Sequence, residues 1–235
     1  MYTTDDTITA ISTPYGQSGI GIVRLSGPLA LTIADAIFKP SGTKTLKDLA
    51  TFKIAYGHII DKHTERFVDE VIVSVMKAPK SYTCQDVVEI NCHSGFFVLK
   101  QVLELTIKHG ARLAKPGEFT FRAYINGRID LVQAEAVMDL IRAATEKGYN
   151  AAINQLDGNL SNKINALSHS LTMLLAHIEA YIDFPDDETG TFNPEDFKGT
   201  IYTIIEDMET LSNSFHYGRL CRDGIGLAIC GKPNV

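Results

Sequence analysis

The sequence predicts an α+β domain followed by an all-α helical segment. In the first half, short runs rich in β-branched residues mix with helical patterns, without the regular repetition of a parallel βαβ sheet. From about residue 131 to 218, apolar residues recur at intervals of three and four, which is typical of helices. We therefore expect one domain over residues 1–126, a helical segment over 127–222, and the beginning of a third domain over 223–235.

The elements of the first half follow from local patterns. Strands are expected at residues 20–25, 52–60, 70–76 and 87–92. Helices are expected at residues 29–38, 96–109 and 118–124. Gly27 and Pro28 open the first of these helices, because proline suits the first helical turn.

The second half is expected to hold three helices. The first spans residues 131–144, with Asp130 as its N-cap. The second is long, because one apolar stripe runs from Ile153 to Tyr181. After an acidic turn at residues 182–188, Asn193 and Pro194 open the third. These stripes exceed what three helices can bury among themselves, so we expect later helices or a second subunit to complete the bundle.

Composition narrows the classes of function. The chain has 235 residues and a formal net charge of −6. No apolar run is long enough to span a bilayer, and the N-terminus lacks the features of a signal peptide, so we expect a cytoplasmic protein with no membrane partner. An acidic chain without a basic run is expected to bind RNA weakly by itself, since nucleic-acid affinity depends on Lys and Arg. The four cysteines show no metal-ligand spacing.

Two charged residues lie inside predicted strands. Arg24 shares a strand face with Ile20 and Ile22, and is either a paired structural side chain or an anion clamp. Glu89 stands in an alternating apolar run and needs a partner, because burying an unpaired charge is costly. That partner is either an internal arginine or a ligand with paired N–H donors, such as the amino-pyrimidinone edge of a pterin.

The connection between the two halves, residues 115–131, combines glycines, Glu118 early in a helix, and several cations. Ligand sites are common between domains, so this connection is a candidate site. The structural alternative is a capped helix and a surface hinge with solvated charges. No Ser/His/Asp arrangement, carboxylate pair or metal motif stands out, and His93 is expected to be structural. The region is therefore predicted to bind a ligand and not to be a self-contained catalyst.

The last five residues predict the beginning of a nucleotide site. Gly231 to Val235 follow an apolar run and match the first positions of the phosphate-binding loop G-x-x-x-x-G-K-[ST]. The alternative is an ordinary turn, because proline and asparagine favour turns for local reasons.

Several segments together resemble the MnmE family, also called TrmE, of bacterial and organellar tRNA-modification GTPases. Their order and spacing over the whole chain carry this resemblance, which in turn favours the phosphate loop over the ordinary turn. The segments are residues 6–10, 19–27, 115–136, 182–188 and 231–234.

The resemblance implies a fold and a function. The first domain would have the folate-binding fold of aminomethyltransferases, bind 5-formyl- or methylene-tetrahydrofolate, and form a homodimer. The helical domain would be interrupted by an inserted Ras-like G domain. The family modifies C5 of the wobble uridine of tRNA together with the flavoprotein MnmG, in a heterotetramer whose FAD belongs to the partner. GTP hydrolysis with potassium and magnesium drives its conformational cycle.

The resemblance also implies site residues. Arg24, Glu89 and Arg128 match the folate-contacting positions, with arginine at 128 where the family often has lysine. Glu89 would accept the N–H edge of the pterin, and the cations would hold carbonyl or glutamate-tail oxygens. Asn234 matches the position that coordinates potassium and GTP, and Val235 belongs to the same nucleotide-binding loop. No catalytic residue is implied, and the chain as given is expected not to hydrolyse GTP.

Two segments beside Glu89 depart from the family's sequence. Residues 81–86 read SYTCQD where the family has SFTGED, and residues 92–95 read CHSG where it has GHGG. The changes at Cys84, Gln85 and Ser94 bear on the shape of the pocket and on folate affinity. Two alternatives stay open from the sequence, a stand-alone folate-dependent aminomethyltransferase and a purely structural dimerisation arm of a GTPase.

Overall fold

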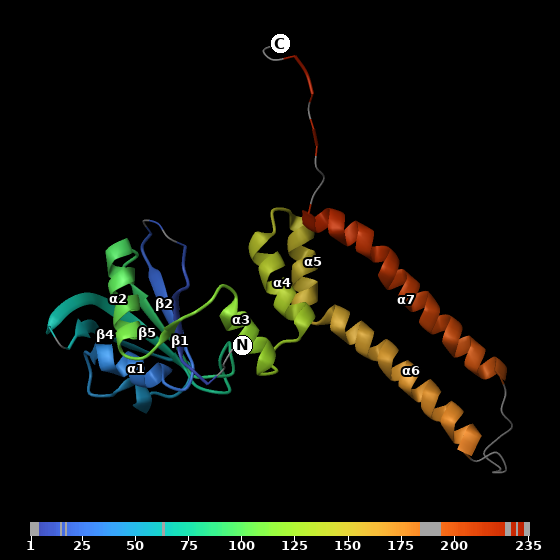
Figure 1. The fold of residues 1–235 in the computed structure, drawn as a ribbon, viewed down its shortest axis with the longest axis horizontal. Coiled ribbons are helices and arrows are strands. Elements are labelled where there is room, and N and C mark those ends of the chain that lie inside the picture. The colour runs from blue at the N-terminus through green and yellow to red at the C-terminus, as the bar shows by residue number, and fades with distance from the viewer. Residues whose placement is uncertain are drawn as a thin grey trace. The chain divides into compact units, whose positions relative to one another are not determined.

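The computed structural model describes residues 5–14, 16, 18–62, 64–183, 194–223, 227–228 and 230–232. The chain divides into two compact units, Met1–Ile129 and Asp130–Val235. The first unit contains a β-sheet with helices, and the elements described in the second are helices (Figure 1). A mixed α+β region followed by helices, as the sequence predicts, is confirmed.

A seven-stranded sheet forms the centre of the first unit, with the strand order β3-β4-β5-β6-β2-β1-β7. Neighbouring strands are antiparallel, except that β1 and β7 are parallel. The strands are β1 Ile8–Ile11, β2 Gly21–Ser26, β3 Phe38–Pro40, β4 Lys53–Asp61, β5 Arg66–Met76, β6 Val87–Cys92 and β7 Arg112–Leu113.

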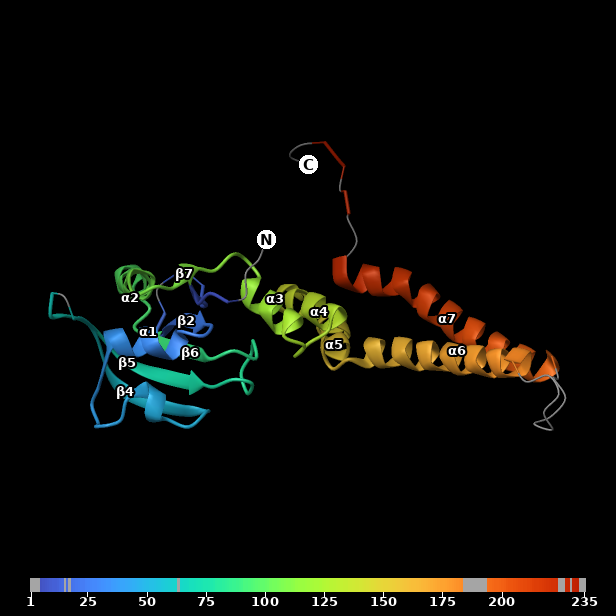
Figure 2. The ribbon, with the colours of Figure 1, turned by 60° about the horizontal axis from the view of Figure 1, so that its bottom comes forward.

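Two helices, α1 Ala30–Ile37 and α2 Phe96–Lys108, lie over one face of the sheet (Figure 2). Successive strand residues point to opposite faces, so alternate apolar side chains pack beneath these helices and form the core. Fully buried members of this core are Val23, Leu25, Val73, Val75, Val88 and Ile90. The other face is partly open, because Ile54, Tyr56 and Ile72 are 67%, 52% and 46% exposed.

The strands and helices predicted in the first unit are all present. The largest displacement is the start of β5, which begins at residue 66 and not at 70. Phe38 was predicted to end a helix and instead begins β3, where it pairs with Ile59. The predicted helix at residues 118–124 is α3 Glu118–Ile125, which follows β7. β1, β3, β7 and the short 3-10 helix Leu46–Asp48 were not predicted.

The described helices of the second unit are α4 Leu131–Arg142, α5 Glu146–Leu156, α6 Asn159–Asp183 and α7 Pro194–Asp223. Asp130 caps α4 as predicted, since its Oδ1 accepts the Gln133 N–H at 2.8 Å. The Gln133 side-chain amide also donates a hydrogen bond to the Leu156 carbonyl oxygen at 2.9 Å, and this bond connects the start of α4 to the end of α5.

The prediction of one long helix through residues 153–181 is wrong. The chain breaks between α5 and α6 at Gly158, whose φ of 82° lies in the left-handed region that a helix cannot continue through. The apolar stripe continues across the break, which is why the pattern alone indicated a single helix. The acidic turn beyond Asp183 and the cap at Asn193 lie outside the described residues.

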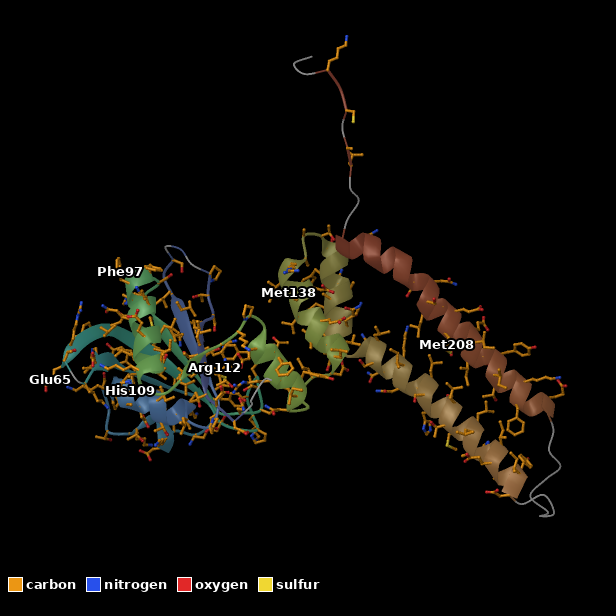
Figure 3. All side chains as sticks on the ribbon, in the orientation of Figure 1. Glu65, Phe97, His109, Arg112, Met138 and Met208 are labelled. Atoms are coloured by element: carbon orange, nitrogen blue, oxygen red, sulfur yellow. The ribbon has the colours of Figure 1, made fainter. Side chains whose placement is uncertain are left out.

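The two long helices leave apolar surface open. α6 has no buried residue along its length, and on α7 Ile204 is buried while Met208 is 51% exposed (Figure 3). An edge-to-face contact between Tyr181 and Phe197, 5.9 Å between ring centroids, joins the two helices. None of the described helices has both the length and the apolar character needed to cross a membrane.

Two glycine substitutions test the helix break. Gly158→Ala places a Cβ on a left-handed residue and should lower the free energy of unfolding by about 1–2 kcal/mol. Gly199→Ala, inside α7 with open space around it, should raise it by about 0.5–1 kcal/mol. Urea unfolding followed by circular dichroism measures both. A change of the same sign in the two variants would contradict the assigned break.

Candidate functional site

Arg24 and Glu89 form an ion pair on the partly open face of the sheet. They are direct cross-strand partners on β2 and β6, and Arg24 Nε and Nη2 lie 2.7 and 2.6 Å from Glu89 Oε1. The side chains are 29% and 22% exposed. The expectation that Glu89 has a charged partner is confirmed, and the partner within the chain is the internal arginine.

The first turn of α3 covers this pair. The Arg24 guanidinium lies over the ring of Phe119, 5.5 Å from its centroid. A cation over an aromatic face is attracted by the ring's electrons, more strongly when water is partly excluded. Arg24 is therefore held from two sides, by a carboxylate and by an aromatic ring. Both of its contacts to Glu89 use Oε1, so Oε2 has no hydrogen-bond partner among the described residues.

Arg128 lies in a second cluster, which also contacts α3. Its guanidinium stacks over the ring of Tyr82, 4.9 Å from the centroid, and forms no ion pair with a described residue. The Tyr82 hydroxyl is 2.9 Å from the Thr120 hydroxyl, and Thr120 directly follows Phe119. The structure thus pairs Arg24 with Glu89 and attaches Arg128 to them through neighbouring residues of α3.

A buried ion network fixes α3. Glu118 and Arg122, one turn apart, have side chains only 1% exposed. Arg112 Nη2 donates to Glu118 Oε1 at 2.6 Å, and its Nε donates to Asp6 Oδ2 at 2.7 Å (Figure 3 labels Arg112). Arg122 pairs with the Asp6 carboxylate and donates to its backbone carbonyl. The alternative of a hinge with solvated charges is therefore wrong for Glu118 and Arg122.

The network keeps Glu118 ionised. Burial alone would raise the pKa of Glu118, but hydrogen bonds from Arg112 and from the Lys115 N–H outweigh it and leave the pKa below its ordinary value. Charge-assisted hydrogen bonds of this kind are the strong ones in proteins. A carboxylate at the N-terminal turn of α3 is also favoured by the helix dipole.

Gln85 links the network to the loop that carries Tyr82. Its Oε1 accepts hydrogen bonds from Arg122 and from Ser26, both at 3.1 Å. Ser26 Oγ also lies 2.7 Å from Thr83 Oγ1, and the Asn126 side chain donates to the Thr83 carbonyl at 2.6 Å. Gln85 is one of the positions that depart from the family's sequence, and here it has a structural role.

A hollow of about 370 Å³ opens beside Arg128. It lies within the first unit, between the start of β4, the end of β5 and the loop leading to β6. Its lining residues are Phe52, Met76, Pro79, Lys80, Ser81, Tyr82, Cys84 and Arg128.

His93 forms a pair with Asp69 that the sequence did not reveal. His93 Nδ1 is 2.8 Å from Asp69 Oδ1, and the His93 backbone N–H donates to Oδ2 at 2.8 Å. Asp69 raises the pKa of His93 above its ordinary value by hydrogen bonding and by its charge. Burial, and then the charge of Asp69, raise the pKa of Cys92 to about 12, so its thiol stays protonated at neutral pH. The imidazole is 72% exposed, and nothing in the sequence links residues 24 apart on different elements.

The nucleotide-binding residues predicted at the end of the chain, Asn234 and Val235, lie outside the described residues. Gly231 and Lys232 are described and have no regular secondary structure. Within the described part of the chain, no group of His, Cys, Asp and Glu side chains is arranged to hold a metal ion.

Comparison with known proteins assigns both units. The family model described as "GTP-binding protein TrmE N-terminus" matches residues 7–128, and "MnmE helical domain" matches residues 131–226. The chain is 52% identical over 231 residues to the tRNA modification GTPase MnmE of Carboxydothermus hydrogenoformans and 48% identical to that of Bacillus subtilis. These alignments cover 98% of this chain and 50% of each relative, so the chain spans about half the length of the curated relatives it matches.

The Asp69 contact predicts the titration of His93. Asp69→Asn should lower the pKa of His93 toward 6.5, measured by NMR of its imidazole protons. Because the folded-state pKa is raised, the contact stabilises the fold below about pH 6.5, and this contribution is lost as the pH rises through the raised pKa.

Glu70→Gln, on the same strand, is the control. It removes a charge that acts on His93 only through space, so it should lower the pKa less than Asp69→Asn does. An equal pKa in the wild type and in Asp69→Asn would show that the contact does not form in solution.

Proposed function

The chain belongs to the MnmE (TrmE) family of tRNA modification GTPases, and from that membership we propose that its first unit binds a reduced folate through Arg24, Glu89 and Arg128. In the whole protein, this folate would supply a one-carbon unit for modification of C5 of a tRNA wobble uridine. GTP hydrolysis by a potassium- and magnesium-dependent G domain would drive the cycle, with MnmG as the flavoprotein partner. The work on tRNA would take place in the cytoplasm.

The observation that carries the folate proposal is the half-exposed Arg24–Glu89 pair under Phe119. Arg24 engages Oε1, which leaves Glu89 Oε2 to accept an N–H from a ligand. The amino-pyrimidinone edge of a pterin offers two adjacent N–H donors, which match a carboxylate. Arg24 then holds the Glu89 carboxylate in a fixed orientation, and the Phe119 ring supplies an apolar wall for a planar ligand.

The cation needed for the other end of a folate is Arg128. It stacks on Tyr82 and has no acidic partner among the described residues. Planar guanidinium groups bind carboxylates with two parallel hydrogen bonds, so Arg128 suits a glutamate-tail carboxylate. The match of residues 131–226 to a helical domain favours the GTPase role over a stand-alone aminomethyltransferase.

We also propose that the chain forms a homodimer through the open face of the sheet. Ile54, Tyr56 and Ile72 lie on adjacent strands there, with Tyr56 and Ile72 in direct cross-strand register. A contiguous exposed apolar surface on a soluble domain marks an interaction site. A second copy using the same face gives a closed, two-fold symmetric interface.

Folate titration tests the site. Glu89→Gln and Arg24→Ala should each weaken binding of 5-formyl-tetrahydrofolate by about 10- to 100-fold, the value of one charge-assisted hydrogen bond. Glu104→Gln, an exposed carboxylate on α2, is the matched control and should bind as the wild type does. Isothermal titration calorimetry measures the folate affinity of the wild type and the three variants. Unchanged affinity in both site variants would remove the assignment, and no binding by the wild type would leave the purely structural arm.

Sedimentation velocity tests the dimer. Ile54→Asp should weaken self-association by about 100-fold or more, because a two-fold interface contains one Ile54 from each copy and the variant would bury two carboxylates. Leu113→Asp, a residue 54% exposed on β7, makes the same kind of change elsewhere and should leave the dimer intact. A monomeric wild type at micromolar concentration would refute the proposal.

A further inference from the structure

The hollow beside Arg128 has two walls of different character. Phe52, Met76, Pro79 and Tyr82 provide apolar surface, and Phe52 is 66% exposed. Lys80 and Arg128 provide two cations on the same hollow. An apolar slot with convergent cations is suited to a ligand that has a flat apolar part and more than one carboxylate.

The cations of the hollow are not neutralised by the protein. Neither Lys80 nor Arg128 forms an ion pair with any residue that the structure describes. Asp86, in the same loop, directs Oδ1 to the Ala78 backbone N–H at 2.9 Å. The described residues that line the hollow thus include two cations and no carboxylate, although the chain as a whole carries a net charge of −6.

The backbone around the hollow is strained and held in place. The described residues other than glycine with positive φ are Phe52, Glu65 and Cys84, and two of these three line the hollow. The Phe52 N–H donates to the Val75 carbonyl at 2.8 Å, which anchors this conformation to β5. Residues in such unfavourable conformations gather at ligand sites, where the surrounding structure imposes them.

Residues of α3 connect the hollow to the proposed folate site by contacts. Arg24 lies against Phe119, the next residue Thr120 contacts the Tyr82 hydroxyl, and Tyr82 is a wall of the hollow. A chain of contacts therefore runs from Arg24 through α3 and Tyr82 to Arg128, which also lines the hollow.

We propose that this hollow binds the tail of the folate and selects folates that carry several γ-linked glutamates. The apolar wall takes the p-aminobenzoyl ring, Arg128 holds the carboxylate of the first glutamate, and Lys80 holds a carboxylate further along the tail. This inference rests on the proposed function, since it extends the same ligand from the same site.

Paired titrations test the inference. The whole chain is titrated calorimetrically with 5-formyl-tetrahydrofolate carrying one glutamate and with the form carrying five. The wild type should bind the longer form about tenfold more tightly, the value of one charge-assisted hydrogen bond, and Lys80→Gln should abolish most of this preference. Affinity for the form with one glutamate should be unchanged in Lys80→Gln.

The controls separate this proposal from the folate proposal itself. Lys39→Gln makes the same charge change at an exposed residue of β3 and should keep the preference for the long tail. Glu89→Gln should weaken the binding of both forms of the folate by the same factor, because Glu89 contacts the pterin end in the proposed site. If the wild type binds both forms with equal affinity, or if Lys80→Gln keeps the preference, the tail site is refuted while the folate site stands.

A measurement of tRNA affinity tests whether Lys80 binds RNA and not the folate tail. If Lys80→Gln lowers the affinity of the chain for tRNA and leaves the tail preference intact, Lys80 belongs to an RNA surface and the tail proposal is wrong. If the wild type binds neither form of the folate, the tail site and the folate proposal fail together.

Discussion

The first unit depends on the ion network of Asp6, Arg112, Glu118 and Arg122. Taking Glu118 and Arg122 out of water costs several kcal/mol per ion, and only near-complete hydrogen bonding repays that cost. Two carboxylates and two guanidinium groups meet that requirement, joined by the Gln85 amide and by backbone groups. The members come from the N-terminal segment, β7, α3 and the loop before β6, so the network fixes the place of α3 on the sheet.

The placement of α3 determines how far the Arg24–Glu89 pair is covered, which the sheet alone does not. The sheet supplies the Arg24–Glu89 pair through cross-strand register, but that pair would be an ordinary surface ion pair without Phe119 above it. Because Phe119 and Thr120 lie between Glu118 and Arg122, the buried network sets the position of both functional contacts. Partial cover from α3 reduces access of water to Arg24 and makes its attraction to Glu89 stronger than in bulk solvent.

The sequence predicted the parts of the fold that local pattern controls. The alternation in residues 87–92 indicated the buried and open faces of β6, and it correctly marked Glu89 as a charge in need of a partner. β1 and β7 escaped prediction because they are short and depend on pairing, β1 with β2 and with β7, and β7 with a strand far away in the sequence. Gly158 separates α5 from α6, and the apolar stripe, which continues through both helices, did not indicate this break. The Asp69–His93 pair depends on tertiary contact and left no local signal.

The distribution of neutralised and free cations refines the roles of the predicted residues. Arg24, Arg112 and Arg122 each contact a carboxylate of the protein, so their charge is already used within the fold. Arg24 is therefore better suited to holding Glu89 in place than to binding an anion, and in the proposed folate site Glu89 would be the group that accepts the ligand's N–H donors. The anionic end of the proposed ligand would be left to cations that have no acidic partner among the described residues, and around the hollow these are Lys80 and Arg128. A protein with an acidic overall charge can in this way bind a polycarboxylate, because the local charge balance of the site and not the net charge of the chain determines the attraction at short range.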